Sequence, residues 1–506
     1  MIKFLKIAAA ATLLSTTAFS AHAGKADDTL RWASAYPVNT PDPYYNVSRE
    51  MTTMMAPLVW DTLVYRDPET NEIVPGLAEF WSMPDATTIE FKLRDGVTWQ
   101  NGEPLTVADA VYTLNYIADP AHKIPQQSNY NWVEQAEDAG DNVLRLKLKA
   151  PFAPAFQYLA QLMPILPDGY YGDNDQAPAI ADVVGTGPYK ISEFTPGSGM
   201  SVTLTDNAWE GNPKGEPSIG TITYRQIPDP ATQIAEVLSG GIDWIYNVNA
   251  DQKESLAASP RLDVVTSGAI RFSNIQFNAL PEISGAKNPL SDVRVRQAVA
   301  HAIDRQAIAE ALVGPEAVVQ KSACYETQFG CYQDTPQYEF NPERAKELLA
   351  EAGYPDGLTL DIQGFRSRDW LSAVGQYLGE AGIKTNIDFL PYTNAQEKLS
   401  NGLFQLYLHD DGSISLNDTY AFLNRLFAPN YDKTDNPKVA ELLEAAMVEQ
   451  DDEKRKQLYA EVLTLISEEV YMLPLWSHPQ TYAVSKELDF KPWEDELPRF
   501  YLSSWK

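Results

Sequence analysis

The sequence contains few of the residues on which catalytic and metal-binding sites depend. Only two of its 506 residues are cysteine and five are histidine, and the histidines are scattered. No G-x-S-x-G, H-E-x-x-H or P-loop motif occurs, and Pro188 follows the lone Gly185-x-Gly187 where a phosphate-binding helix would have to open. We therefore expect a protein that is not an enzyme and that holds neither a cofactor nor a metal.

Basic residues are also scarce, with 39 Lys and Arg against 69 Asp and Glu and a formal net charge of -30. This excess repels nucleic acid and anionic lipid. It also mildly favours cationic solutes, although an acidic surface equally improves solubility. Beyond the first 23 residues, no stretch approaches the roughly 18 to 20 apolar residues of a membrane helix. We expect neither nucleic-acid binding nor membrane insertion.

The N-terminus has the layout of a cleavable signal peptide over residues 1–23. Lys3 and Lys6 precede an apolar run from Ile7 to Phe19, and Ala21-His22-Ala23 forms an A-x-A cleavage site before Gly24. No cysteine near this site could carry a lipid. The sequence predicts export to a Gram-negative periplasm as a soluble protein, long enough for two or three domains.

The two cysteines, Cys324 and Cys331, are separated by six residues. In an exported chain this spacing predicts a disulfide that closes a small loop. A metal site would need further ligands, and the nearest histidine, His301, is more than twenty residues away.

Helical and strand-like patterns alternate along the chain, which predicts an α/β protein. Thr106 can cap a helix, and Asn341-Pro342 and Asn436-Pro437 combine an N-cap with proline at the first helical position. Apolar spacing predicts one helix from Ser291 to Gly314. Strand-like runs at Leu358 to Gln363 and at Thr385 to Phe389 lie between helices.

The segment from Leu403 to Leu423 is the candidate functional region. An apolar run through Leu408 predicts a buried strand that ends before His409, Asp410 and Asp411. Carboxylates at a strand end are well placed to hold a ligand, although Asp411-Gly412 is also ordinary turn chemistry. Adjacent residues of a strand point to opposite faces, which argues against a catalytic acid/base pair.

Five stretches, in order, resemble the bacterial extracellular solute-binding proteins of family 5, which deliver peptides, nickel or opines to ABC importers. They are DTLVY (61–65), VPGLAEFW with FKLRDGVTWQNGEPLTVADAVYTL (74–81 and 91–114), GTGPYKISEF (185–194), SDVRVRQAVAHAIDR (291–305) and NPERAKELLAEAGYPDG (341–357).

The resemblance implies a two-lobed periplasmic-binding-protein fold of type II, with a hinge and three domains. Carried onto this sequence, domain I takes residues 24–56, 184–270 and 476–506, domain II takes residues 57–183, and domain III takes residues 271–475. Family members close their lobes around the ligand, so that a ligand contacting both lobes stabilises the closed form.

The resemblance also implies site residues. Peptide-binding relatives hold the ligand's ammonium with a carboxylate at the position of Asp410 or Asp411. This chain has Leu416-Asn417-Asp418 where relatives often have Asp-Pro-Asp, which leaves open which Asp faces the cleft. Arg366 and Arg368 match an arginine that forks a ligand carboxylate; the alternative is a surface arginine paired with Asp369. Tyr246 would line the cleft or belong to the core.

The predicted function is therefore the periplasmic, monomeric substrate-binding component of an ABC importer, with membrane permease subunits as its partners and a small peptide or peptide-like solute as its ligand. An opine, an oligosaccharide or glycoside, or a chelated metal held with His409 and His478 remain alternatives, and a secreted hydrolase is the alternative from another class.

Overall fold

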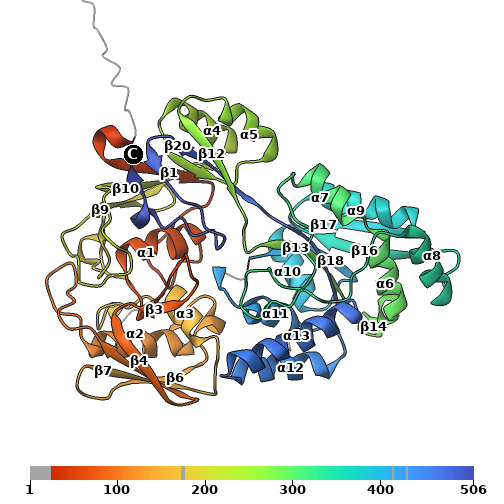
Figure 1. The fold of residues 1–506 in the computed structure, drawn as a ribbon, viewed down its shortest axis with the longest axis horizontal. Helices are drawn as coiled ribbons and strands as arrows, with labels where there is room; N and C mark the ends of the chain where they lie inside the picture. The colour runs from red at the N-terminus through yellow and green to blue at the C-terminus, as the bar shows by residue number, and fades with distance from the viewer. Residues whose placement is uncertain (1–23, 173–176, 413–414, 429–430) are drawn as a thin grey trace, which may run out of the picture.

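The computed structural model describes residues 24–172, 177–412, 415–428 and 431–506, so the predicted signal peptide lies outside the described residues. Three large sheets organise the chain into two lobes (Figure 1). The first lobe contains a seven-stranded and a four-stranded sheet, and the second contains a five-stranded sheet with helices around it. In the described part of the chain, no helix is long and apolar enough to cross a membrane.

The seven-stranded sheet collects strands from three distant parts of the chain. The central strand β1 runs parallel to both of its neighbours, and the other strand pairs are antiparallel. In spatial order the strands are β12 (Leu262–Ser267), β20 (Gln480–Ser485), β11 (Trp244–Tyr246), β1 (Thr29–Ser34), β10 (Thr221–Gln226), β9 (Gly199–Leu204) and β8 (Tyr189–Thr195). Helices α4 (Pro230–Ser239) and α5 (Ala250–Ala257) follow β10 and β11.

The four-stranded sheet of the first lobe is antiparallel, in the order β4 (Ala78–Asp85), β5 (Thr88–Leu93), β7 (Val143–Leu148) and β6 (Val133–Asp138). Helix α2 (Val107–Ala118) begins at the predicted cap, where Thr106 and Asp109 form a capping box. Smaller elements of this lobe are a π-helix (Glu50–Met55), α1 (Ala56–Val59), α3 (Ala155–Gln161), and the strand pairs β2 (Val64–Arg66) with β3 (Ile73–Pro75) and β21 (Leu488–Asp489) with β22 (Ser504–Trp505).

The second lobe is built on a five-stranded sheet in the order β17 (Ile383–Phe389), β16 (Leu358–Gly364), β18 (Leu406–Asp411), β13 (Phe272–Phe277) and β19 (Met472–Ser477). The core includes Ile362 and Leu408 of the sheet and Leu371 and Val374 of a covering helix. The helices are α6 (Val293–Ala302), α7 (Arg305–Leu312), α8 (Pro342–Glu351), α9 (Arg368–Glu380), α10 (Tyr392–Ser400), α11 (Thr419–Phe427), α12 (Pro437–Val448) and α13 (Asp452–Glu468), and β14 (Glu282–Ile283) pairs with β15 (Ala286–Lys287).

The predicted single helix from Ser291 to Gly314 is wrong, because the chain forms α6 and α7 with a break between them. Ile303 is extended, with φ -104° and ψ 118°, and the side chain of Asp304 accepts a hydrogen bond from the amide of Ala307. Aspartate is unfavourable inside a helix but stabilises a helix as its N-cap, so Asp304 favours the start of a new helix over continuation of α6. The caps predicted at Asn341 and Asn436 are confirmed, and each accepts an amide hydrogen bond from the first turn.

Two short connections join the lobes. Residues 268–271 link β12 to β13, and residues 478–479 link β19 to β20 (Figure 1). The amide of His478 donates to the carbonyl of Arg271 at 3.0 Å, so the connections run side by side. This pair of connections is called the hinge below. The predicted domain boundaries stay a prediction; β19 runs two residues past the predicted end of domain III at Leu475.

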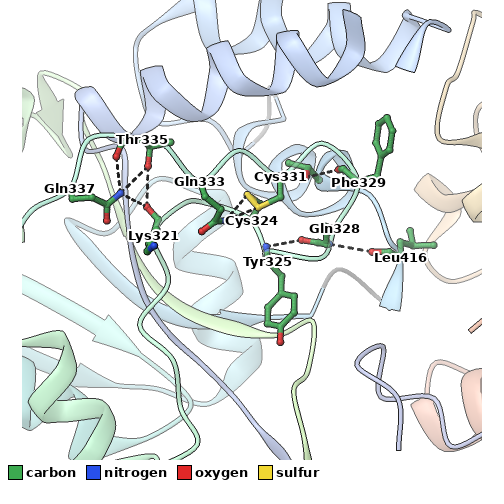
Figure 2. The surroundings of a disulfide bond; sticks show 11 residues. Lys321, Cys324, Tyr325, Gln328, Phe329, Cys331, Gln333, Thr335, Gln337 and Leu416 are labelled. Carbon is green, nitrogen blue, oxygen red and sulfur yellow. Dashed lines mark hydrogen bonds between the residues drawn. A yellow bond between two sulfur atoms is a disulfide. The ribbon is translucent and has the colours of Figure 1, made fainter. Parts of the chain in front are cut away.

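The disulfide expected from the sequence joins Cys324 to Cys331 in the second lobe (Figure 2). The loop that it closes contacts the chain beyond β18. The side-chain amide of Gln328 donates to the carbonyl of Leu416 at 3.2 Å, and the carbonyl of Phe329 accepts from the backbone amide of Thr419. The cross-linked loop therefore supports the segment that follows the candidate strand.

Candidate ligand-binding cavity

A cavity of about 890 Å³ lies where the two lobes meet at the hinge. Both lobes and both hinge connections contribute to its lining. From the first lobe come Tyr36, Val47, Arg49, Glu50, Tyr246, Asn247, Asp251, Lys253 and Glu496; from the hinge and β20 come Arg271, His478 and Gln480; from the second lobe come Leu312, Glu316, Arg366 and Trp370.

Tyr246 lines this cavity at the end of β11 and is largely buried. Its hydroxyl donates to Oε1 of Glu50, which also accepts from the hydroxyl of Ser34 at 2.8 Å. Burial, reinforced by the charge of Glu50, raises the pKa of Tyr246 well above its usual value, so the phenol keeps its proton. The structure thus places Tyr246 in the cavity wall with its hydroxyl engaged by Glu50.

Asp410 lies inside a strand, which corrects the expectation that the strand ends before His409. β18 continues through Asp411 and pairs with β13 along its whole length, with Phe272 opposite Asp411 and Ser273 opposite Asp410. Carboxylates are tolerated in this buried strand because arginines neutralise them. Asp410 Oδ2 lies 3.0 Å from Nη1 of Arg271 and 3.4 Å from Nη2 of Arg366.

Asp410 therefore faces the cavity side of the sheet but stands behind the two arginines. Only 2% of its side chain is exposed. Burial alone would raise its pKa, but the charges of Arg366 and Arg271 outweigh burial and lower the pKa to about 2. In this structure its carboxylate holds the two guanidinium groups in place.

Asp411 points to the opposite face of β18, as strand alternation requires. Its Oδ2 lies 3.1 Å from Nε of Arg425 in α11. His409 shares that face, where it is buried and stacks on the ring of Tyr407 with centroids 4.6 Å apart. Neither Asp411 nor His409 is among the described residues that line the cavity.

The two predicted arginines occupy different places. Arg366 follows β16, lines the cavity and has 42% of its side chain exposed. Arg368 is the first residue of α9, and its guanidinium lies over the ring of Phe389, 4.9 Å from the centroid. Of the two, only Arg366 is placed to reach a molecule in the cavity.

Charged residues that the sequence analysis did not select complete the cavity wall. Glu496 lies 3.3 Å from Arg271 and 3.8 Å from Arg49. Burial alone would raise the pKa of Glu496, but Arg271 and Arg49 lower it. Five alternating charges thus run across the hinge, in the order Arg49, Glu496, Arg271, Asp410, Arg366, and are called the charge chain below. No local motif marks Arg271 or Glu496, because 225 residues separate them.

His478 occupies the hinge end of the cavity. Its Nε2 lies 2.8 Å from Oγ of Ser273, and its ring lies 5.1 Å from that of Trp370. Burial lowers the pKa of His478 to about 4, so the imidazole is neutral at neutral pH. Within the described ranges, no cluster of three or more His, Cys, Asp or Glu side chains could hold a metal ion.

The comparisons with known proteins agree with this architecture. The family model of bacterial extracellular solute-binding proteins, family 5 Middle, matches residues 72–434. The chain belongs to family 5 of the bacterial extracellular solute-binding proteins. Its relatives are binding proteins. The chain is 26% identical to the glutathione-binding protein GsiB of Salmonella typhimurium over 441 residues, which cover 81% of this chain and 82% of that protein.

The nickel-binding periplasmic protein of Escherichia coli is 24% identical over 530 residues, with 96% of both chains covered. Among solved structures, NikA of Brucella suis in complex with Fe(III)-EDTA has a TM-score of 0.82 at 22% identity, covering 94% of this chain and 100% of that one. The fold of this family 5 protein is the two-lobed type II periplasmic-binding-protein fold that its sequence predicts.

Proposed function

We propose that this family 5 protein is the periplasmic substrate-binding component of an ABC importer and captures a small peptide or peptide-like solute between its lobes. The observation that carries the proposal is the cavity of about 890 Å³ bounded by both lobes and the hinge. Pockets of roughly 300 to 1,000 Å³ enclose ligands of drug size, the range of short peptides.

The lining supports a ligand that is peptide-like. Asn247 and Gln480 offer amide groups, Tyr36 and Trp370 offer aromatic surface, and Arg366 offers a forked donor for a carboxylate. Backbone amides and a terminal carboxylate are the groups that such a wall binds best. Asp410 positions the guanidinium groups of Arg366 and Arg271, and Tyr246 forms part of the cavity wall.

Capture follows from closure of the lobes about the hinge. A ligand that contacts Arg366 in one lobe and Asn247 in the other favours the closed arrangement over the open one by its differential affinity. The closed protein then docks on the permease subunits in the inner membrane as a monomer. The three domains have the boundaries given in the sequence analysis, and each domain is built around one of the three large sheets.

A thermal-shift screen on refolded, ligand-free protein tests this function. Dipeptides and tripeptides should raise Tm, because a ligand at a hundred times its Kd stabilises the folded state by about 2.7 kcal/mol. Opines, glycosides and nickel with histidine are included as the alternative ligands. A shift with one of these and none with peptides refutes the peptide proposal, and hydrolysis of a bound peptide or glycoside refutes the transport role.

A further inference from the structure

We propose that the ligand is an acid whose amino end is blocked, such as an N-acylated amino acid or an N-acylated short peptide. This inference rests on the proposed function and specifies the ligand class of the same cavity. The carboxylate of the ligand binds Arg366, and its other end carries an amide rather than an ammonium.

The first observation is that the buried carboxylates at the cavity already have partners in the protein. Asp410 is paired with Arg271 and Arg366, and Glu496 is paired with Arg271 and Arg49. Glu50 accepts hydrogen bonds from Tyr246 and Ser34. An ammonium could reach Asp410 only by displacing an arginine from a carboxylate that has 2% of its side chain exposed, and the displaced guanidinium would then need another anion.

The two remaining acidic residues of the described lining are more exposed. Glu316 is paired with Lys253, and Asp251 is exposed in the first turn of α5. An ammonium bound to an exposed carboxylate stays solvated and gains little affinity. A free amino group in the inner cavity would therefore lose its hydration beside three arginines, where each buried carboxylate already has partners in the protein.

The second observation concerns Arg366, the second-lobe end of the charge chain. It lines the cavity, is 42% exposed and shares Asp410 with Arg271. A ligand carboxylate can accept from the donors of Arg366 that Asp410 does not engage.

The third observation is an apolar rim. Tyr36, Val47 and Leu312 line the cavity, and their exposed fractions are 52%, 62% and 43%. They come from both lobes. An acyl group or an apolar side chain would cover them when the lobes close, which removes apolar surface from water.

Native mass spectrometry of the refolded protein tests the inference. The protein is incubated with leucyl-leucine and N-acetyl-leucyl-leucine at equal concentrations, and then with matched pools of other free and acetylated dipeptides. We expect the acetylated species to occupy the protein at least ten-fold more than the free species. Equal or preferential binding of free dipeptides overturns the inference but leaves the proposed function standing, whereas binding of neither class overturns both.

Arg366 and Arg368 provide a matched pair of variants. Arg366→Ala should lower the occupancy by the acetylated peptide at least ten-fold, and Arg368→Ala should leave it unchanged, because Arg368 lies over Phe389 outside the cavity lining. Arg366→Lys keeps the charge but loses the forked donor, so it should bind with intermediate affinity even if the alanine variant folds poorly. Equal occupancy for all three variants refutes the role of Arg366.

Discussion

Nζ of Lys253 lies 2.5 Å from Oε1 of Glu316, and the two residues belong to different lobes. Lys253 is on α5 beside the seven-stranded sheet, and Glu316 follows α7 in the second lobe. Both line the cavity. This ion pair exists only when the lobes are close together, so it favours the closed arrangement irrespective of the ligand.

Lys253→Ala should weaken ligand binding by about two- to five-fold, because a half-exposed ion pair contributes up to about 1 kcal/mol. Titration calorimetry with a ligand from the screen measures the change. The difference from the wild type should shrink at 1 M salt, where surface charges are screened. Lys346→Ala is the control, because Lys346 pairs with Glu343 within α8. Equal affinities for the two variants would show that the ion pair between the lobes does not contribute.

Asp410→Asn should lower the free energy of unfolding by about 1.5 to 3 kcal/mol, because Arg271 keeps Glu496 but loses its charge-assisted hydrogen bond to Asp410. Arg366→Ala should cost less than about 1 kcal/mol, because its side chain is 42% exposed. Urea denaturation at pH 7 compares them. Asp369→Asn, at an exposed site on α9, is the control. A loss as small as that of the control would refute the central place of Asp410 in the charge chain.

The elements that sequence predicts well are those with local causes. A helix start is predicted from a few neighbouring residues, such as Thr106 with Asp109 and Asn341 with Pro342. The end of β18 was misplaced because the factor that allows Asp410 and Asp411 inside a buried strand lies elsewhere, in Arg271 and in Arg425. Pairing between residues so far apart depends on the fold.

The site was also predicted only in part, because most of its residues come together through the fold and not through a local pattern. Arg366 and Tyr246 were placed at the cavity by resemblance, and the structure brings both to its wall. Their binding roles stay predictions. Arg49, Arg271 and Glu496 were missed because a single charged residue in a loop has no pattern that distinguishes it from a surface residue. Only the hinge brings these three together.

Two histidines, the buried His409 and the half-buried His478, predict loss of stability in mild acid. Burial lowers the pKa of His409 and of His478 to about 4 in the folded protein, against about 6.5 in an unfolded chain. Below pH 6.5 the unfolded chain binds protons that the folded protein does not, so the free energy of unfolding falls as the pH drops toward 4. The loss is on the order of 3 kcal/mol for His409 and smaller for His478, which lines the cavity.

Replacing both histidines tests this pH dependence. The double variant His409→Gln with His478→Gln should show a flatter fall in unfolding free energy between pH 6.5 and 4.5 than the wild type does. Urea denaturation at several pH values measures the two slopes. Identical slopes would show that other groups cause the acid sensitivity.

The disulfide should stabilise both the protein and the segment beyond β18. It closes a loop of eight residues, 324–331, for which restriction of the unfolded chain accounts for about 2.5 kcal/mol. Replacing Cys324 and Cys331 by serine should lower Tm accordingly, and a reductant should lower Tm of the wild type alone. Because Phe329 accepts the amide hydrogen of Thr419, that amide should exchange faster in the variant. A lower Tm with unchanged exchange at Thr419 would confine the effect of the disulfide to the unfolded chain, and the cross-linked loop would then have no part in holding the segment that follows Asp410 and Asp411.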